Sequence, residues 1–158
     1  MDATPDPMPL EGRFDGREHL FAVRVYFEDT DLSGVVYHAN YLRYMERARS
    51  AMLRAAGVDQ RAAFEAGEGA YAIRDLTIRY AAPARLDDTL TVISRLISTR
   101  QASVVIQQRV MRGPVILTHA QVEAAFVAPS GRPRRQPAAW MAAFKNLIWQ
   151  GEQGNTWN

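Results

Sequence analysis

The chain of 158 residues contains no cysteine. Disulfide bonds, thiolate metal ligands and cysteine nucleophiles are therefore excluded, and the absence fits a reducing compartment. No segment approaches the ~20 consecutive apolar residues of a transmembrane helix. The N-terminus also lacks the basic start and the apolar stretch of a signal peptide. These absences predict a soluble cytoplasmic protein without a transmembrane segment.

Neither positive nor negative charge is in large excess, since the formal net charge at pH 7 is only +2. Such a small excess does not indicate a nucleic-acid partner. Nearly all of the basic residues are arginine, with Lys145 as the single lysine. Arginine suits bidentate contact with phosphate, although a codon-usage bias would give the same count.

Signatures of metal and nucleotide binding are missing too. The three histidines, His19, His38 and His119, do not have the spacing of metal ligands. No glycine-rich phosphate loop of the usual kinds is present. We therefore expect no metal and no cofactor.

The length predicts one domain, because domains usually contain ~100–200 residues. A chain of this size can bury roughly 70% of its unfolded surface, so it can form a core without covalent staples. Residues 1–18, with three prolines and no apolar run, are predicted to form a disordered N-terminal tail. The domain then spans residues 19–150, and residues 151–158 form a C-terminal tail.

Five segments have the composition of strands. "LFAVRVYFE" (20–28) is rich in β-branched and aromatic residues. Four more candidates follow at 72–81, 89–99, 103–112 and 115–128. In the last one, alternate residues share one side of the pleat, namely Ile116, Ala120, Val122, Ala124 and Phe126.

Residues 41–56, "YLRYMERARSAMLRAA", have the period of an amphipathic helix. The predicted apolar face consists of Leu42, Met45, Ala48, Met52 and Ala55. Three arginines, Arg43, Arg47 and Arg54, fall on another face that we expect to be solvated. Gly57 is a natural stop because glycine readily adopts the left-handed conformation after a last turn.

One long helix therefore follows the first strand, and four consecutive strands follow the helix. A further helix is predicted over residues 138–149, where Trp140, Phe144 and Ile148 are four residues apart. This order indicates an α+β fold, with an antiparallel sheet packed on one face by the long helix.

The segment "EDTDLSGVVYHANYLRYMERAR" (28–49) concentrates chemistry just before that helix. Chemistry at a carbonyl carbon needs a group that attacks or activates water and donors that stabilise the oxyanion. Asp31 supplies a carboxylate, and the helix start supplies unpaired N–H groups and a positive dipole end. Asp29 and Asp31 also have a plainer interpretation as turn caps.

The residues Tyr26-Phe27-Glu28-Asp29-Thr30-Asp31, followed by Gly34-Val35-Val36-Tyr37-His38 and Tyr41, resemble the signature of hotdog-fold acyl-CoA thioesterases. The similarity is to the 4-hydroxybenzoyl-CoA thioesterase-like superfamily and, within it, to the YbgC-like proteins associated with the Tol–Pal system. It implies a hotdog fold, an antiparallel sheet of about five strands wrapped around the helix at 39–56. It also implies homodimers with the active site at the subunit interface, and homotetramers built from them.

The resemblance assigns roles within the loop. Asp31 is implied to be the nucleophile or general base, and the His38 backbone N–H to polarise the thioester carbonyl. Gly34 allows close approach of substrate and backbone, while Val35, Val36 and Tyr37 line the acyl pocket. Coenzyme A enters only as part of the acyl-CoA substrate, with acyl carrier protein as the other carrier to consider.

Arg132, Arg134 and Arg135 in "GRPRRQP" are a separate hypothesis, since exposed arginines could grip the phosphates of coenzyme A. A merely solvated basic loop is the plainer interpretation. The hydroxybenzoyl branch has an aromatic residue and then proline where this chain has His38 and Ala39. This departure favours the YbgC-like group over an aromatic substrate, and it makes the His38 imidazole a candidate to orient water.

Two rival functions remain open at this stage. One is a hotdog dehydratase or hydratase, although its usual pairing of a catalytic histidine with a remote acid is not visible. The other is an acyl-carrier-protein-binding or scaffold protein at the inner membrane. An intact Asp31 favours the enzyme over a purely binding module.

Overall fold

The computed structural model describes residues 3–151, so almost all of the tail predicted at 151–158 lies outside the described residues. Its strands are β1 (Arg13–Asp15), β2 (Glu18–Arg24), β3 (Ala70–Tyr80), β4 (Thr89–Thr99), β5 (Ser103–Arg112) and β6 (Val115–Val127). Its helices are α1 (His38–Ala55), α2 (Gln60–Glu65) and α3 (Ala138–Lys145), with a short 3₁₀ turn at Phe27–Asp29. The predicted elements follow one another in the predicted order, with β1 and α2 in addition, and β4 and β5 have the predicted bounds.

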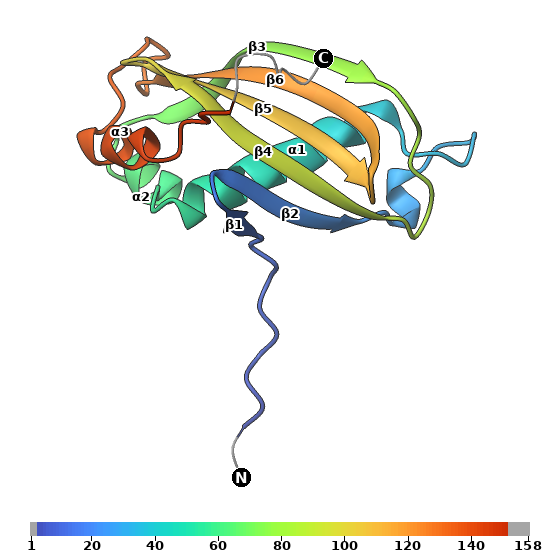
Figure 1. The fold of residues 1–158 in the computed structure, drawn as a ribbon. Coiled ribbons are helices and arrows are strands. Elements are labelled where there is room, and N and C mark those ends of the chain that lie inside the picture. Colours follow the sequence, from blue (N-terminus) through green and yellow to red (C-terminus); the bar gives the residue numbers. More distant parts are fainter. Residues whose placement is uncertain (1–2, 152–158) are drawn as a thin grey trace.

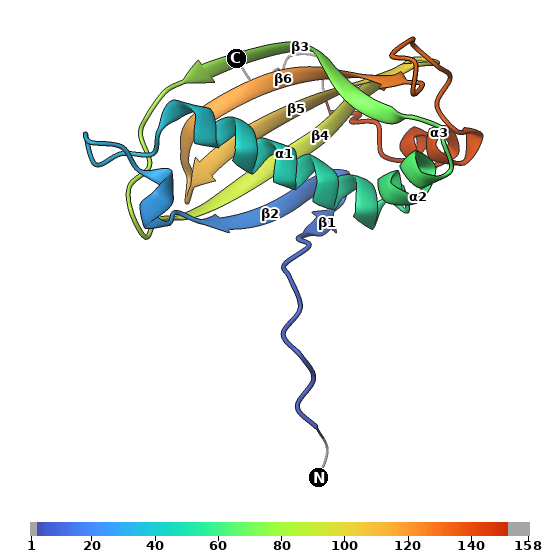
Figure 2. The same ribbon diagram turned by 180° about the vertical axis from the view of Figure 1, so that it is seen from behind.

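All strands join one antiparallel sheet in the order β1-β2-β4-β5-β6-β3. The sheet curves around α1, which lies along its inner face (Figures 1 and 2). The predicted α+β hotdog fold is confirmed, with six strands instead of about five. Because β6 pairs with both β5 and β3, β3 ends the sheet, and no strand of residues 3–151 pairs with its other edge.

The additional strand lies within the segment predicted to be a disordered tail. β1 pairs with β2 through Arg13, Phe14 and Asp15, and Glu18 already belongs to β2. A strand of three residues is too short to show an alternating pattern, which explains why sequence periodicity did not reveal it. The domain therefore begins earlier than residue 19.

Helix α1 forms the centre of the core. Its buried residues are Asn40, Tyr41, Tyr44, Met45, Ala48, Ala51, Met52 and Leu53. The predicted face is correct at Met45, Ala48 and Met52, but Ala55 is exposed, so the buried stripe lies closer to the two tyrosines. The three predicted surface arginines are exposed. Gly57 ends the helix as predicted, with a φ of 86°.

The far end of α1 is closed by the two shorter helices. α2 was not predicted; Asp59 caps it by accepting a hydrogen bond of 2.9 Å from the Ala62 N–H. α3 buries Trp140 and Phe144 against the end of the sheet. It stops before Ile148, which instead forms a parallel bridge to Leu96 of β4. None of the helices in residues 3–151 is long and apolar enough to cross a membrane.

Candidate active site

The loop between β2 and α1 closes on itself in front of the helix N-terminus. Thr30 and Val36 form an isolated antiparallel bridge, and the Val36 N–H donates to the Ala84 carbonyl at 2.9 Å. The Asp31 N–H donates to Val35 O, and the Gly34 N–H donates to Asp31 O, each at 3.0 Å. The predicted motif is therefore one tight turn held by several backbone hydrogen bonds.

Asp31 occupies the start of this turn and is exposed. Its Oδ1 accepts hydrogen bonds from the Ser33 N–H at 2.8 Å and from the Ser33 Oγ at 2.5 Å. The hydroxyl first, and then the backbone N–H, hold the pKa of Asp31 below the ordinary aspartate value. A carboxylate has about four acceptor positions, so this turn leaves capacity for a water molecule or a substrate. Asp31 can therefore cap the turn and still bind a water molecule or a substrate.

Asp29 has a structural role, in agreement with its plainer interpretation as a turn cap. Its Oδ2 accepts from the Tyr26 N–H at 2.8 Å, which shapes the 3₁₀ turn before the loop. Its carbonyl accepts from the Tyr37 N–H and from the buried Asn40 Nδ2, both at 2.9 Å. Asn40 was not identified from the sequence. These bonds fix the start of α1 against the loop that carries Asp31.

His38 is the first residue of α1, directly after Tyr37 at the N-cap. Its backbone N–H donates to no acceptor in the described residues, as expected for the first turn of a helix. The helix dipole places partial positive charge at the same point. The His38 side chain is exposed, and its charge contributes to lowering the pKa of Asp31. The loop thus presents a carboxylate and a free donor to the same region.

The remaining loop residues divide between turn, core and surface. Gly34 has a φ of 78°, so the turn itself requires glycine there. Val35 is half-buried and bridges Arg85, whereas Tyr37 is 47% exposed. Val36 is only 4% exposed and belongs to the core cluster. The expectation that Val36 lines a substrate pocket is therefore wrong.

Two tyrosines support the helix start: Tyr80, which sequence analysis did not place at the site, and Tyr41, the last residue of the motif. Tyr80, at the end of β3, donates from its hydroxyl to the His38 carbonyl at 2.9 Å. The Tyr41 hydroxyl accepts from the Ala84 N–H at 2.9 Å, and burial raises the pKa of this tyrosine. No local pattern could reveal Tyr80, because it reaches the loop only through the sheet.

Apolar side chains surround the loop without being covered. Phe27 is 81% exposed and Leu32 is fully exposed, and Tyr26 and Leu86 are also largely exposed. A gathering of exposed apolar residues around a polar centre is typical of a surface that another molecule covers.

Arg132 does not lie near Asp31 within one protomer. It follows β6, whose last residue pairs with Ala70 at the start of β3, whereas the loop contacts the end of β3. An antiparallel strand of this length spans roughly 30 Å. Arg134 has a structural role instead, since its guanidinium donates hydrogen bonds to the carbonyls of Gly67 and Glu68. The structure thus separates the basic loop from the Asp31 turn.

Comparison with known proteins agrees with this fold and loop. The family model of the Thioesterase superfamily matches residues 33–118. The acyl-CoA thioester hydrolase YbgC of Escherichia coli O6:H1 is 43% identical over 125 residues, covering 78% of this chain and 92% of that protein. The acyl-CoA thioesterase YbgC of Haemophilus influenzae is 40% identical, covering 80% of this chain and 94% of that protein.

Solved structures give the same result. The crystal structure of a probable thioesterase from Bartonella henselae superposes with a TM-score of 0.72 at 37% identity, covering 76% of this chain and 99% of that one. The family suggested by the loop residues is confirmed. The chain belongs to the Thioesterase superfamily, has the hotdog fold and is a relative of the YbgC proteins.

Proposed function

We propose that this protein hydrolyses an acyl-CoA thioester to a free acid and coenzyme A. The observation that carries the proposal is the pairing of the Asp31 carboxylate with the free N–H of His38 in one rigid loop-helix unit. The YbgC relatives support it, since their names describe acyl-CoA thioester hydrolysis.

The proposed reaction needs only water and the protein. As a general base, Asp31 takes a proton from water while the oxygen attacks the carbonyl carbon. As a nucleophile, it forms an anhydride that water then hydrolyses. In both routes the C–S bond breaks, coenzyme A leaves as a thiolate and is then protonated. We propose no metal and no redox cofactor.

The N–H of His38 stabilises the oxyanion of the tetrahedral intermediate. A fixed backbone donor costs no reorganisation when negative charge develops on the carbonyl oxygen. The first turn of α1 adds its dipole to this donor. Gly34, Val35 and Tyr37 line the path of the thioester, because they lie on the exposed side of the turn between Asp31 and His38.

A homodimer completes this site. β3 has an open edge of eleven residues, a length that natural proteins seldom leave unpaired. Antiparallel pairing of two β3 edges about a twofold axis brings the start of one β3 beside the end of the other. The partner then covers the exposed apolar residues around the loop and brings its Arg132 toward the Asp31 turn, where it can contact the phosphates of coenzyme A.

The test is thiol release from a panel of short, long and aromatic acyl-CoAs by wild-type protein and Asp31→Asn. Asparagine keeps the size of the side chain but cannot accept a proton or form the anhydride. We expect turnover to fall by roughly 10²–10⁴-fold with an unchanged melting temperature, since general acid–base catalysis contributes that much. Asp29→Asn is the matched control, and its loss of activity should be accompanied by a loss of stability.

Hydrolysis by Asp31→Asn at the wild-type rate would contradict the assignment of Asp31. Hydrolysis of acyl carrier protein thioesters alone would instead transfer the proposal to that carrier. The cytoplasmic location and the association with the Tol–Pal system stay predictions.

A further inference from the structure

The outer face of the sheet, turned away from α1, carries a row of basic side chains across three strands. Arg79 of β3 lies directly opposite His119 of β6, and His119 lies directly opposite Arg109 of β5. His119 alternates along β6 with the buried Thr118 and Ala120, so its side chain faces outward. Neighbouring strands are roughly 4.8 Å apart, so the three backbone positions lie within about 10 Å. Arg79, His119 and Arg109 are called the basic row below.

The members of the basic row disfavour one another's positive charge. Like charges at opposed positions of a sheet are destabilising. Burial first, and then the charges of Arg79 and Arg109, hold the pKa of His119 below its ordinary value. Burial first, and then Arg95, lower the pKa of Arg109. An anion placed on this row would remove the repulsion and stabilise the charged forms.

The carboxylate that acts on this row, that of Glu18 on β2, is already bound elsewhere. It accepts a hydrogen bond of 2.9 Å from the Arg95 Nε, and the Arg95 guanidinium stacks 3.8 Å from the centre of the Trp149 ring. Arg79 is exposed, and neither Arg79 nor His119 forms a hydrogen bond or an ion pair among residues 3–151. The Arg79 end of the row therefore keeps an unbalanced positive charge.

A hollow of about 430 Å³ lies over this part of the sheet. It is bordered by Arg79 and His119 at one end and by Thr77, Gln107 and Gln121 at the other. The Gln107 Nε2 donates to the Gln121 Oε1 at 3.2 Å, so the Gln121 Nε2 is the amide group that remains to donate to a ligand. The hollow thus offers cationic donors at one end and neutral hydrogen-bonding groups at the other.

We propose that this hollow binds a small organic phosphate of the nucleotide type. The phosphate group lies over the His119 imidazole and receives hydrogen bonds from the Arg79 guanidinium, while Arg109 adds positive charge from the other side. The polar body of the ligand lies against the amides of Gln107 and Gln121. The ligand enters from solvent without displacing any element of the fold.

The charge and size of the hollow favour a phosphate ester over a carboxylate. An arginine guanidinium binds phosphate through two parallel N–H bonds, and the tetrahedral group still has an oxygen for a donor on the next strand. A phosphate monoester carries a charge of about −1.5 to −2 at pH 7, so it can balance Arg79 and His119 together. The volume of about 430 Å³ lies within the roughly 300–1,000 Å³ of pockets that hold small ligands, which leaves room for an organic body.

Two acidic residues on the same face limit the length of the ligand. Asp75 lies directly opposite Glu123, four residues before Arg79 on β3 and thus roughly 13 Å away along the strand. Glu123 has only a long contact of 3.8 Å with the exposed Arg74, so this pair keeps much of its negative charge. A nucleic acid or an extended acidic peptide that follows the strands would meet these carboxylates. A ligand confined to the hollow avoids them.

The site does not depend on the proposed function. The Asp31 turn lies at the N-terminus of α1, on the inner side of the sheet, whereas the hollow lies on the outer side. Arg132, which is proposed to contact the phosphates of coenzyme A, follows Val127 at the end of β6. Val127 is eight residues from His119, or roughly 27 Å along the strand. A phosphate in the hollow is therefore a second ligand of this chain and not a part of the thioester substrate.

Imidazole NMR signals test the location, because the chain has only three histidines. Sodium sulfate, which has the tetrahedral shape of phosphate, is titrated at constant ionic strength against sodium chloride, and His119→Gln identifies the His119 signal. We expect this signal to shift and saturate while that of the buried His19 stays in place. A shift confined to His38 would place the anion at the N-terminus of α1 instead and would contradict the proposal.

Calorimetric titration with adenosine 5′-monophosphate (AMP) tests the residues. We expect Arg79→Gln to weaken AMP binding by roughly ten- to hundredfold, the usual effect of losing a hydrogen-bonded charge pair. Arg47→Gln is the matched control, because Arg47 is an exposed arginine on α1, and it should bind AMP like the wild type. Inorganic phosphate should bind the wild type more weakly than AMP, since it lacks the body that contacts the amides. Circular dichroism reports that each variant is folded.

Three further results would overturn the proposal. They are equal AMP affinity in Arg79→Gln and Arg47→Gln, inorganic phosphate that binds as tightly as AMP, and a KM for acyl-CoA that rises in Arg79→Gln as much as the AMP affinity falls. The last result would assign the basic row to the phosphates of the thioester substrate. AMP binding by a wild-type protein that hydrolyses no thioester would count against the proposed function alone and would support this site.

Discussion

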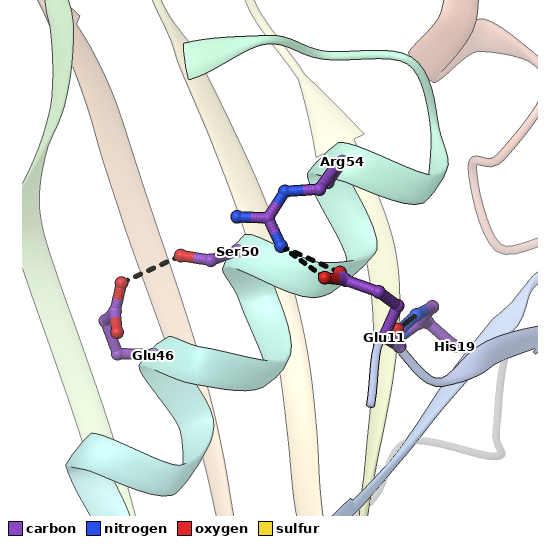
Figure 3. Close-up of polar contacts among 5 residues, drawn as sticks. All are labelled: Glu11, His19, Glu46, Ser50 and Arg54. Atoms are coloured by element: carbon purple, nitrogen blue, oxygen red, sulfur yellow. Dashed lines mark hydrogen bonds and ion pairs between the residues drawn. The ribbon is translucent and has the colours of Figure 1, made fainter. Parts of the chain in front are cut away.

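The two ends of α1 differ in almost every physical respect. At the N-terminal end, the Asp31 turn is exposed, and the first N–H of the helix has no acceptor among residues 3–151. At the C-terminal end, α2, α3 and the N-terminal segment close over the helix. Figure 3 shows the Glu11 carboxylate bound to Arg54 on the last turn, with His19 beside it.

This difference separates stability from chemistry along a single helix. The C-terminal half packs in a cluster with Trp140, Phe144 and Phe126, all nearly buried. The N-terminal half leaves its first donor free, which is the condition for binding an anionic or polarised group. Changes at one end should therefore alter unfolding, and changes at the other end should alter turnover.

The largest effect on stability is expected from Phe144→Ala. Phe144 is 1% exposed, so its removal leaves a cavity and should lower the free energy of unfolding by about 3–5 kcal/mol. Urea unfolding measures this loss, and turnover per folded molecule should stay near the wild-type value. Phe64→Ala is the matched control, because Phe64 is 69% exposed on α2 and its removal should change stability little. Equal losses of unfolding free energy in the two variants would contradict the assignment of stability to the C-terminal end of α1.

Among changes in α1 itself, the largest effect on turnover without unfolding is expected from His38→Pro. Proline is favoured at the first helical position and lacks the N–H. Tyr37 has φ −60° and ψ 133°, a conformation that the residue before a proline accepts. Losing an oxyanion donor typically costs about 10²–10³-fold in kcat. His38→Ala keeps the N–H, so its kcat should fall little. A large fall in kcat in this control would show that the imidazole takes part in the reaction.

A moderate, pH-dependent effect is expected at His19. This residue is fully buried, its Nε2 bonds the Glu11 carbonyl at 3.1 Å, and burial lowers its pKa. As the pH falls below about 6.5, the unfolded chain therefore binds a proton at His19, whereas the folded chain leaves His19 unprotonated. Stability should fall by up to about 1.4 kcal/mol per pH unit in that range.

Thermal melting from pH 7.5 to pH 5 measures this slope. His19→Gln cannot titrate, so the slope from this group should be absent in the variant even if its stability at pH 7.5 is lower. An equally steep loss in both proteins would assign the effect to other groups.

The smallest effect is expected from Ser33→Ala. Without the Ser33 hydroxyl, the pKa of Asp31 should rise toward the ordinary aspartate value. Because the base must be ionised, the acid limb of kcat/KM should move to higher pH while the plateau changes little. Ser50→Ala removes a hydroxyl that bonds Glu46 on α1 and should leave the limb in place. If the acid limb of kcat/KM does not move, the titration of Asp31 does not govern the rate.

The sequence alone predicted the fold class, the long helix and five strands, because their patterns are local and extend over many residues. It also identified the Asp31 turn, whose residues adjoin one another in the chain. β1 and α2 were missed because three and six residues are too few to show a period. Tyr80 and Asn40 were missed at the site, because sheet topology and loop folding decide their positions.

The strand order has a consequence for how this chain acquires its structure. β3 follows α1 in the sequence, but within the described part of the chain it pairs only with β6, the last of these strands to be synthesised. During synthesis β3 stays unpaired, with Tyr71, Leu76 and Ile78 exposed, until about forty further residues have left the ribosome and β6 is available. Such long-range pairing is slow and open to association with other chains. Efficient production of this protein should therefore depend on how fast β6 reaches β3, and on what shields β3 before then.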